Sequence, residues 1–357
     1  MNKLATEASP TEAEALSRAI WFANSLVMKN VPLPLLRQPS SQYSSLIESV
    51  EHLLLERHRA KQLFLPELSA FNNRSIGLFS DYSGEGPGRY FVFSVLICGF
   101  NMRASFEAHM GEIRKRFGLG TKEIAYKDLK MGPVHRALPE YLAAADKLPG
   151  FLCTVAVDKR IKSVFGTMPD IQRRLVDALN SVGVSVRKPA IAEKLARVVH
   201  LAAYLTALLG HNGQKVFWMT DNDEICPTQE RHMELLNLFA RVLPEYQRFG
   251  CQFDLMGGAT PFEERSVEMN DLLSLPDLAA GIFGDYLTKR DDRKHEEIYV
   301  KQGADKIMLW LGSDGIGLKK LCCVLRKGGG DFLERCTIKF DPVSPTPRTV
   351  IPIFDWA

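Results

Sequence analysis

The chain has 357 residues, of which 46% are hydrophobic and 24% charged, and its net charge is +3 at pH 7. This composition is typical of a globular protein with one large domain or two, and the charge is too small to identify a polyanionic partner. The longest apolar runs, 90–100 and 198–209, are shorter than the roughly 20 residues that cross a bilayer, so we expect a cytoplasmic protein with no membrane span.

Residues 1–70 have a helical pattern that differs from the rest of the chain. Helices are expected from about residue 11 to 28 and from about 44 to 64, separated by the Pro-containing residues 31–34. The segment carries seven Lys or Arg and seven Asp or Glu residues, so it lacks the basic excess of a typical DNA-binding arm. We interpret it as an accessory helical layer or a surface for a protein partner.

From residue 75 onward, strand and helix patterns alternate. Residues 75–84 predict a short strand, 85–88 a Gly- and Pro-containing turn, and 90–100 a longer strand, so a β-hairpin is expected. The later patterns predict, roughly, a helix over 101–118 capped by Asn101, strand-like alternation over 121–129, a helix over 133–147, a strand over 151–157, helices over 170–180 and 189–209, a strand over 215–219, a helix over 228–242, a strand over 251–256 and a helix over 275–289. Near the end of the chain they predict a helix over 304–311, strands over 321–325, 333–340 and 349–354, and a hairpin turn at 327–331.

This order of elements predicts an α/β architecture in which at least part of the sheet is parallel. Ligands of such sheets lie beyond the carboxyl ends of the strands, so acidic residues at those positions are candidates for one shared site. Four acids qualify: Asp81, where the first strand ends, Glu123, before the strand-like stretch, Asp221, where the strand over 215–219 ends, and Asp277, at the start of the last long helix.

Each of these acids also has an ordinary structural explanation. Asp81 and Asp221 could form turns through their own backbone, and Glu123 could be one of many solvated acids. The stretch 274–277 reads Ser-Leu-Pro-Asp, so Asp277 could close a capping box at a helix start. Taken together, however, the acids suit phosphoryl transfer, because a two-metal site needs several hard oxygen ligands that face one point.

Four short motifs resemble those of a large prokaryotic family that carries a domain of unknown function. They are Asp-x-Ser-Gly (Asp81, Ser83, Gly84) before a second apolar strand, Glu-Ile-x-x-Lys-Asp-Leu (residues 123–129), Thr-Asp (Thr220, Asp221) and Leu-Leu-x-Leu-x-Asp-Leu-Ala-Ala-Gly (residues 272–281). The resemblance covers about residues 75–290. The chain departs from the family at Tyr82, where Glu is the commonest residue, and at 274–277, where Gln-x-Ala-Asp is usual.

The resemblance implies a ribonuclease H-like fold of the retroviral integrase superfamily, with a mixed sheet flanked by helices. We expect this core over residues 71–295, after a helical extension over 1–70 and before a small α+β extension over 296–357. By fold analogy it also implies a nuclease site that binds Mg²⁺ or Mn²⁺. The expected catalytic residues are Asp81, Glu123, Asp221 and Asp277, of which Asp81, Asp221 and Asp277 bind the metal. Lys127 and Asp128 are expected beside them, Lys127 toward a scissile phosphate, and Asp223 and Asp285 are alternative ligands.

Other enzyme classes are disfavoured by missing motifs. There is no Cys-x-x-Cys or His-x-x-x-His pair for zinc, and Ser83 is not in a Gly-x-Ser-x-Gly elbow. The leading hypothesis is therefore a metal-dependent nuclease acting on DNA or RNA, in a mobile-element or defence setting. A non-catalytic subunit that binds nucleic acid or a protein partner is the alternative, and a transposase or integrase is less expected because residues 1–70 have balanced charge.

Overall fold

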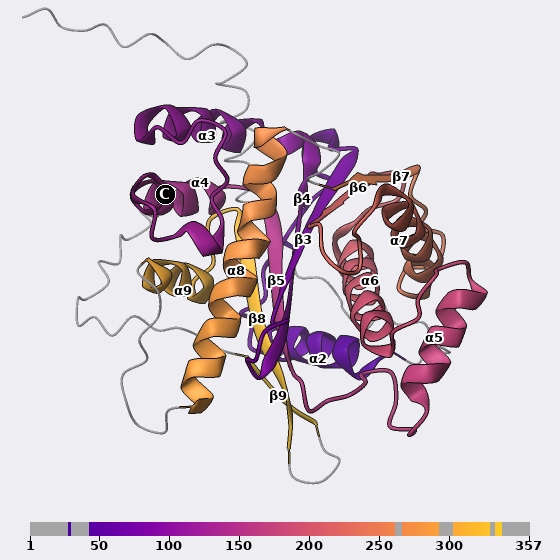
Figure 1. Cartoon of the computed structure of the whole chain (residues 1–357). Coiled ribbons are helices and arrows are strands. Elements are labelled where there is room, and N and C mark those ends of the chain that lie inside the picture. Colours follow the sequence, from indigo (N-terminus) through magenta and orange to yellow (C-terminus); the bar gives the residue numbers. More distant parts are fainter. Residues whose placement is uncertain (1–27, 30–42, 261–265, 293–302, 329–332, 338–357) are drawn as a thin grey trace, which may run out of the picture.

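The computed structural model describes residues 28–29, 43–260, 266–292, 303–328 and 333–337 (Figure 1). Within these ranges the main sheet consists of β3 (Ser75–Ser83), β4 (Tyr90–Gly99), β5 (Gly150–Asp158), β6 (Lys215–Thr220), β7 (Leu255–Ala259), β8 (Leu318–Lys327) and β9 (Leu333–Thr337). The helices are α2 (Ser45–Arg59), α3 (Ala104–Phe117), α4 (Gly132–Ala145), α5 (Ile171–Ser181), α6 (Pro189–Leu209), α7 (Gln229–Val242), α8 (Val267–Asp292) and α9 (Ala304–Gly312). A short second ladder joins β1 (Met28–Lys29) to β2 (Leu65–Pro66). The predicted α/β class is confirmed.

The main sheet is mixed, and its order is β7-β6-β3-β4-β5-β8-β9. Three pairs are parallel, namely β3 with β6, β6 with β7, and β5 with β8. The hairpin of β3 and β4, the pair of β4 and β5, and the pair of β8 and β9 are antiparallel. The carboxyl ends of β3, β5, β6, β7 and β8 therefore lie at one edge of the sheet, as the sequence argument requires.

Helices cover both faces of the sheet, and each face has its own core. Figure 1 shows α3, α4, α8 and α9 on one side and α5, α6 and α7, with α2 below, on the other. The first core contains Phe79 from β3 and Phe283 from α8, whereas the second contains Leu78 from β3 and Leu205 from α6. Successive residues of a strand point to opposite faces of the sheet. On β3, odd-numbered residues such as Phe79 therefore face the first core, and even-numbered residues such as Leu78 face the second.

The ends of the chain join this same sheet. Helix α2 contacts α6 and β8, and β8 and β9 continue the sheet beyond β5. The division at residues 70 and 295 stays a prediction. The expected helix over 11–28, apart from its last residue, and the expected strand over 349–354 lie outside the described residues. No helix of the described ranges combines the length and hydropathy that a membrane crossing needs.

Three local predictions are wrong. Asn101 does not cap a helix, because a 3₁₀ turn (Phe100–Met102) comes first and α3 starts after Arg103. Residues 121–129 form a loop with a 3₁₀ turn (Tyr126–Asp128) instead of a strand, since no neighbouring strand pairs with them. Strand β7 begins at Leu255, four residues later than the expected start at Cys251.

The start of α8 is the most important correction. The helix begins at Val267 rather than at residue 275, so Pro276 is inside it. Proline lacks the N–H that would bond four residues back, and this loss normally ends or kinks a helix. The apolar residues around it, Leu272, Leu273 and Leu278, are almost completely buried against the sheet and offset that cost.

Candidate active site

Asp81 lies on β3, near the carboxyl end of the strand. Asp81 is two residues after Phe79 on the strand, so it faces the same side of the sheet, which α8 covers. Its relative exposure is 8%. Tyr82 faces the opposite side, where its hydroxyl contacts the hydroxyls of Ser80 at 2.7 Å and Thr220 at 2.8 Å. A carboxylate at position 82 would therefore point away from the side that Asp81 faces, so the presence of tyrosine there leaves that side unchanged.

Asp221 follows β6 directly and lies beside Asp81. Ser80 pairs with Thr220 in the parallel ladder, and the backbone N–H of Asp221 donates to the carbonyl of Ser80 at 3.0 Å. This extra bond extends the β6 ladder by one residue along β3. Two acids far apart in the sequence thus occupy neighbouring positions at the same sheet edge.

Asp277 comes from α8, which packs across β3 and β4 (Figure 1). It is ten residues after the first residue of the helix, so it does not close a capping box, and the ordinary explanation for this acid is excluded. Its Oδ2 atom instead accepts a hydrogen bond of 2.6 Å from the backbone N–H of Tyr126. Helix α8 is also held to β3 by the Ser83 hydroxyl, which donates to the carbonyl of Ala280 at 2.8 Å.

The glycine of the Asp-x-Ser-Gly motif has a clear backbone reason. Gly84 has a φ of +107°, a region that residues with a Cβ rarely adopt, and a Cβ there would overlap the carbonyl of Tyr90. The motif therefore supplies the acid, the hydroxyl that bonds α8 and the sharp exit from β3, in that order.

Glu123 reaches the same region from the loop before Tyr126, although the expected strand is absent. Burial raises the pKa of Glu123, the cation of Lys127 lowers it, and the charges of Asp221 and Asp128 raise it. The structure therefore brings together Asp81, Glu123, Asp221 and Asp277, which we call the acidic cluster.

The electrostatics of the acidic cluster favour protonation of its members. Burial raises the pKa of Asp81 well above its ordinary value, and the charges of Asp277 and Asp221 raise it further, while the N–H of Tyr82 lowers it. Burial raises the pKa of Asp277 to about 6, against the hydrogen bond from Tyr126, and the charges of Glu123 and Asp221 also raise it. Burial likewise raises the pKa of Asp221. A cation bound among these carboxylates would relieve the repulsion.

Lys127 is the exposed cation that faces the acidic cluster. Its charge lowers the pKa of Glu123, Asp221 and Asp277, so it is close to all three. Lys127 therefore lies beside three of the four expected catalytic residues. Its contact with a scissile phosphate stays a prediction.

The two alternative ligands have other partners. Asp223 Oδ2 lies 2.7 Å from Nζ of Lys194, a lysine whose side chain is only 7% exposed. Asp285 Oδ2 accepts from the hydroxyl of Tyr126 and lies 2.9 Å from Nζ of Lys289. Their charges are therefore largely balanced by other groups, although Asp223 still raises the pKa of Asp81 and Asp221.

Sequence reasoning missed Lys194, which joins the segments that follow the two acid-bearing strands. Its Nζ lies 2.5 Å from Oε1 of Glu85, after β3, as well as 2.7 Å from Asp223, after β6. The lysine itself belongs to α6, on the opposite face from Asp81. A lysine in the second turn of a largely apolar helix was the available signal in the sequence.

The acidic cluster has the right donors for a hard cation but does not yet form a coordination site. Among the described residues, no group of three or more His, Cys, Asp or Glu side chains is placed so that it could hold a metal ion. One oxygen of Asp81 is bonded to the N–H of Tyr82 at 2.5 Å, and one oxygen of Asp277 is bonded to that of Tyr126. Each carboxylate has a second oxygen, and buried anionic oxygens that repel one another are the ligands that Mg²⁺ and Mn²⁺ prefer.

Tyr126 also fixes the distance between the 121–129 loop and α8. Its N–H bonds Asp277 and its hydroxyl bonds Asp285, two turns further along the helix. Gly281 lies midway between these acids, and a Cβ there would fall well inside contact distance of the Tyr126 ring. The glycine that ends the Leu-Ala-Ala-Gly stretch therefore permits this loop to pack on the helix.

We expect Gly281→Ala to destabilise the protein by roughly 1–3 kcal/mol, because an added methyl group overpacks this contact. Gly111→Ala is the matched control: Gly111 is also inside a helix, but nothing lies within 4 Å of its added Cβ, so a gain of up to about 1 kcal/mol is expected. Denaturant unfolding measures both changes. Equal effects of the two substitutions would contradict the role given to Gly281.

Three cavities in the described region lie away from the acidic cluster. Their volumes are about 640, 240 and 220 Å³, and none is lined by a member of the acidic cluster. Comparisons with protein family models, with curated proteins and with solved structures find no match for this chain.

Proposed function

We propose that this protein is a Mg²⁺- or Mn²⁺-dependent nuclease with a ribonuclease H-like core. One observation carries the proposal: Asp81 from β3, Asp221 after β6 and Asp277 from α8 interact at one sheet edge, where burial raises the pKa of Asp81 and the charges of Asp277 and Asp221 raise it further. Helix caps and turns do not require three acids from three separate elements to lie together, whereas binding of a divalent cation does.

The arrangement of strands supports the fold part of the proposal. With β3 as the first strand of the core, β4 and β5 follow on one side as an antiparallel meander, and β6 and β7 add parallel strands on the other. We propose that this order is the ribonuclease H-like one, with β8 and β9 as a C-terminal addition. The acids then occupy the first strand, the position directly after the fourth strand, and the final core helix.

The residues of the acidic cluster have separate roles in this proposal. Asp81, Asp221 and Asp277 would hold the cation, and Glu123, whose pKa burial raises, suits the acceptance of a proton from an attacking water. When bound, the divalent ion supplies a Lewis acid that polarises the phosphodiester and lowers the pKa of that water. Lys127, exposed beside the acids, would contact the phosphate.

A non-catalytic subunit that binds nucleic acid is the second candidate. It is favoured by the absence, within the described ranges, of three carboxylates already placed to hold a metal. The expected partner surface on residues 1–70 stays a proposal for either function. In the described part of this segment, α2 has Leu46, Ile47 and Val50 buried against the core.

The proposal is tested by incubating labelled single- and double-stranded DNA and RNA with the protein in Mg²⁺, Mn²⁺ or EDTA. We expect cleavage of at least one substrate with a metal and none with EDTA or with Asp81→Asn. Binding without cleavage, in either metal, would favour the second candidate. Neither binding nor cleavage of any of these nucleic acids would reject both functions.

A further inference from the structure

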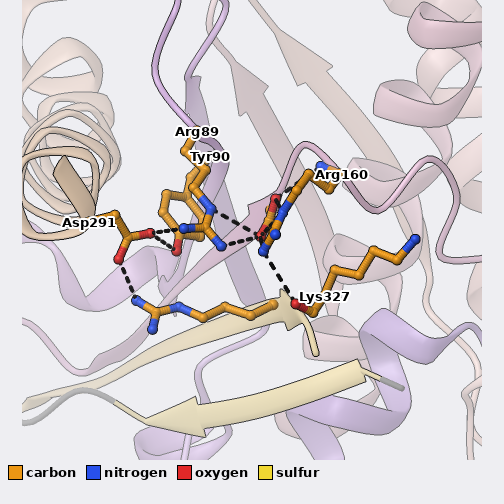
Figure 2. A network of polar contacts seen from close by, with 7 residues as sticks. Arg89, Tyr90, Arg160, Asp291 and Lys327 are labelled. Atoms are coloured by element: carbon orange, nitrogen blue, oxygen red, sulfur yellow. Dashed lines mark hydrogen bonds and ion pairs between the residues drawn. The ribbon is translucent and has the colours of Figure 1, made fainter. Parts of the chain in front are cut away.

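A positively charged region lies where β5 and β8 end. Figure 2 shows its polar network. Asp158, completely buried, accepts hydrogen bonds from Arg89 at 2.9 Å and Arg160 at 2.6 Å. Asp291, on α8, accepts from Arg89, Tyr90 and Arg326. Three arginines in this network meet only two carboxylates, and Lys327, whose backbone carbonyl accepts from Arg160, adds a fourth cation at the end of β8.

Arg160 is held in a defined orientation at the surface of this region. Both its Nε and Nη2 atoms donate to Asp158, and Nη2 also donates to the backbone carbonyl of Lys327 at 3.2 Å. The side chain is nevertheless 55% exposed, and no bond to a described residue uses Nη1. A guanidinium fixed in this way loses little conformational entropy when it binds a phosphate.

One of the three cavities described above opens beside this arginine. It has a volume of about 640 Å³ and lies between the 160–172 segment, the start of α2, the end of β8 and the start of β9. Its charged lining residues are Arg160, Lys162, Lys327 and Glu48, and Tyr43 and Phe165 add aromatic rings. The volume is within the range of small-molecule sites, so it suits one nucleotide unit and is too small for a duplex.

Asp158, which holds Arg160 beside the cavity, is at the same end of the sheet as the acidic cluster, and the cavity itself lies toward the face that α2 and α6 cover. Asp81 pairs with Ser94, and Tyr90, four residues away on β4, pairs with Asp158 on β5. With a rise of about 3.3 Å per residue and strands about 4.8 Å apart, Asp158 is roughly 16 Å from Asp81. A short oligonucleotide spans this distance.

We propose that the 640 Å³ cavity binds one nucleotide of a single-stranded nucleic acid. Arg160, Lys162 and Lys327 would contact its phosphate, and Tyr43 and Phe165 would contact its base. The inference rests on the proposed function, because the bound strand is the substrate whose phosphodiester reaches the acidic cluster. It goes further by selecting single-stranded over double-stranded substrate and by placing a binding site outside the cluster.

The test compares two double variants that remove the same charge. Lys162→Gln with Lys327→Gln changes the cavity, whereas Lys115→Gln with Lys215→Gln changes exposed lysines on α3 and at the opposite edge of the sheet. Binding of a labelled single strand of about 12 nucleotides is measured by fluorescence anisotropy in EDTA at several salt concentrations. We expect the cavity variant to bind the strand at least about tenfold more weakly than wild type. The slope of log binding constant against log salt concentration should fall in magnitude by about 1.4 in this variant, and both quantities should change little in the control.

Other outcomes would overturn the inference. These are equal weakening of both variants, equal binding of the matching duplex through the same lysines, or displacement of the strand by AMP that is no better than displacement by inorganic phosphate at the same concentration. Cleavage of the small diester bis-p-nitrophenyl phosphate with Mn²⁺ tests the acidic cluster separately. This substrate is too small to contact the acidic cluster and the cavity at the same time, so its cleavage does not depend on binding in the cavity. Its failure would count against the proposed function, whereas unchanged strand binding by the cavity variant would count against this inference alone.

Discussion

Asp277→Asn is expected to reduce the rate of metal-dependent cleavage by at least about a hundredfold. Loss of one electrostatic contact that stabilises a transition state typically has an effect of this size. Asparagine retains the size of the side chain and an oxygen that can still accept the hydrogen bond from the N–H of Tyr126. The substitution therefore removes a negative charge with little change in shape. If Asp277 binds the metal, activity falls while the fold survives, because the cation depends on anionic oxygen.

The matched control is Asp285→Asn, two turns along the same helix. Asp285 interacts with Tyr126 and Lys289 and does not belong to the acidic cluster, so its loss should change activity less than about fivefold on the scale of a partly exposed ion pair. Rates are measured on the best substrate at saturating metal, with circular dichroism as the check on folding. Near-normal cleavage by Asp277→Asn, or an equal loss in both variants, would show that Asp277 does not bind a catalytic metal.

Elements with a strong local pattern could be predicted from the sequence. Helix α6 occupies the expected range, since Pro189 suits its first turn and an apolar stripe continues to Leu209. The hairpin of β3 and β4 also occurs as expected, because two runs of β-forming residues flank a turn that contains glycine and proline. Local propensity and tertiary packing agree in both cases.

Elements determined by distant contacts could not be predicted in the same way. The 121–129 loop has the alternation of a strand but pairs with none, and the bond from Tyr126 to Asp277 joins residues 151 positions apart. The sequence around Pro276 is typical of a helix start, yet Pro276 lies inside α8. The free energy gained by burying its apolar neighbours outweighs the cost of one missing backbone hydrogen bond.

The acidic cluster shows the same division. The positions of Asp81 and Asp221 follow from a general rule, since both are at the carboxyl ends of neighbouring parallel strands. Separating Asp277 from Asp285 required the structure, because both lie on one helical stripe and only their partners differ. Lys194 could not be assigned from sequence, because its three acidic neighbours come from two separate loops.

The stability of the metal-free protein should decrease between about pH 4 and pH 7 because of Asp277. Burial raises the pKa of this carboxyl from 3.8 to about 6 in the folded state, so the folded protein binds the proton more tightly than the unfolded chain. The resulting stabilisation is complete below pH 3.8 and is lost as the pH rises through 6. A shift of about two units corresponds to roughly 3 kcal/mol at most.

Other groups titrate in the same range, so the comparison must be between variants. Burial lowers the pKa of His200 to about 4, and a lowered histidine pKa makes stability rise with pH up to about 6.5. Asp158, whose pKa is about 2 because hydrogen bonds from Arg160 and Arg89 outweigh its burial, contributes a constant amount above pH 4. The difference between wild type and Asp277→Asn cancels both contributions, and we expect Asp277→Asn to become the more stable protein as the pH rises to 7.

Divalent metal should reverse this loss at pH 7, because a ligand that binds only the folded state stabilises it by RT ln(1 + [L]/Kd), about 2.7 kcal/mol at a hundredfold excess over Kd. Thermal unfolding with EDTA, Mg²⁺ or Mn²⁺ measures the effect. The increase should vanish in Asp81→Asn, whose carboxyl interacts with both Asp277 and Asp221, and persist in the control Asp285→Asn. An equal metal-induced increase in melting temperature in wild type and Asp81→Asn would place the bound cation outside the acidic cluster. If the metal raised the melting temperature of neither protein, the raised pKa values of the acidic cluster would have no function in metal binding.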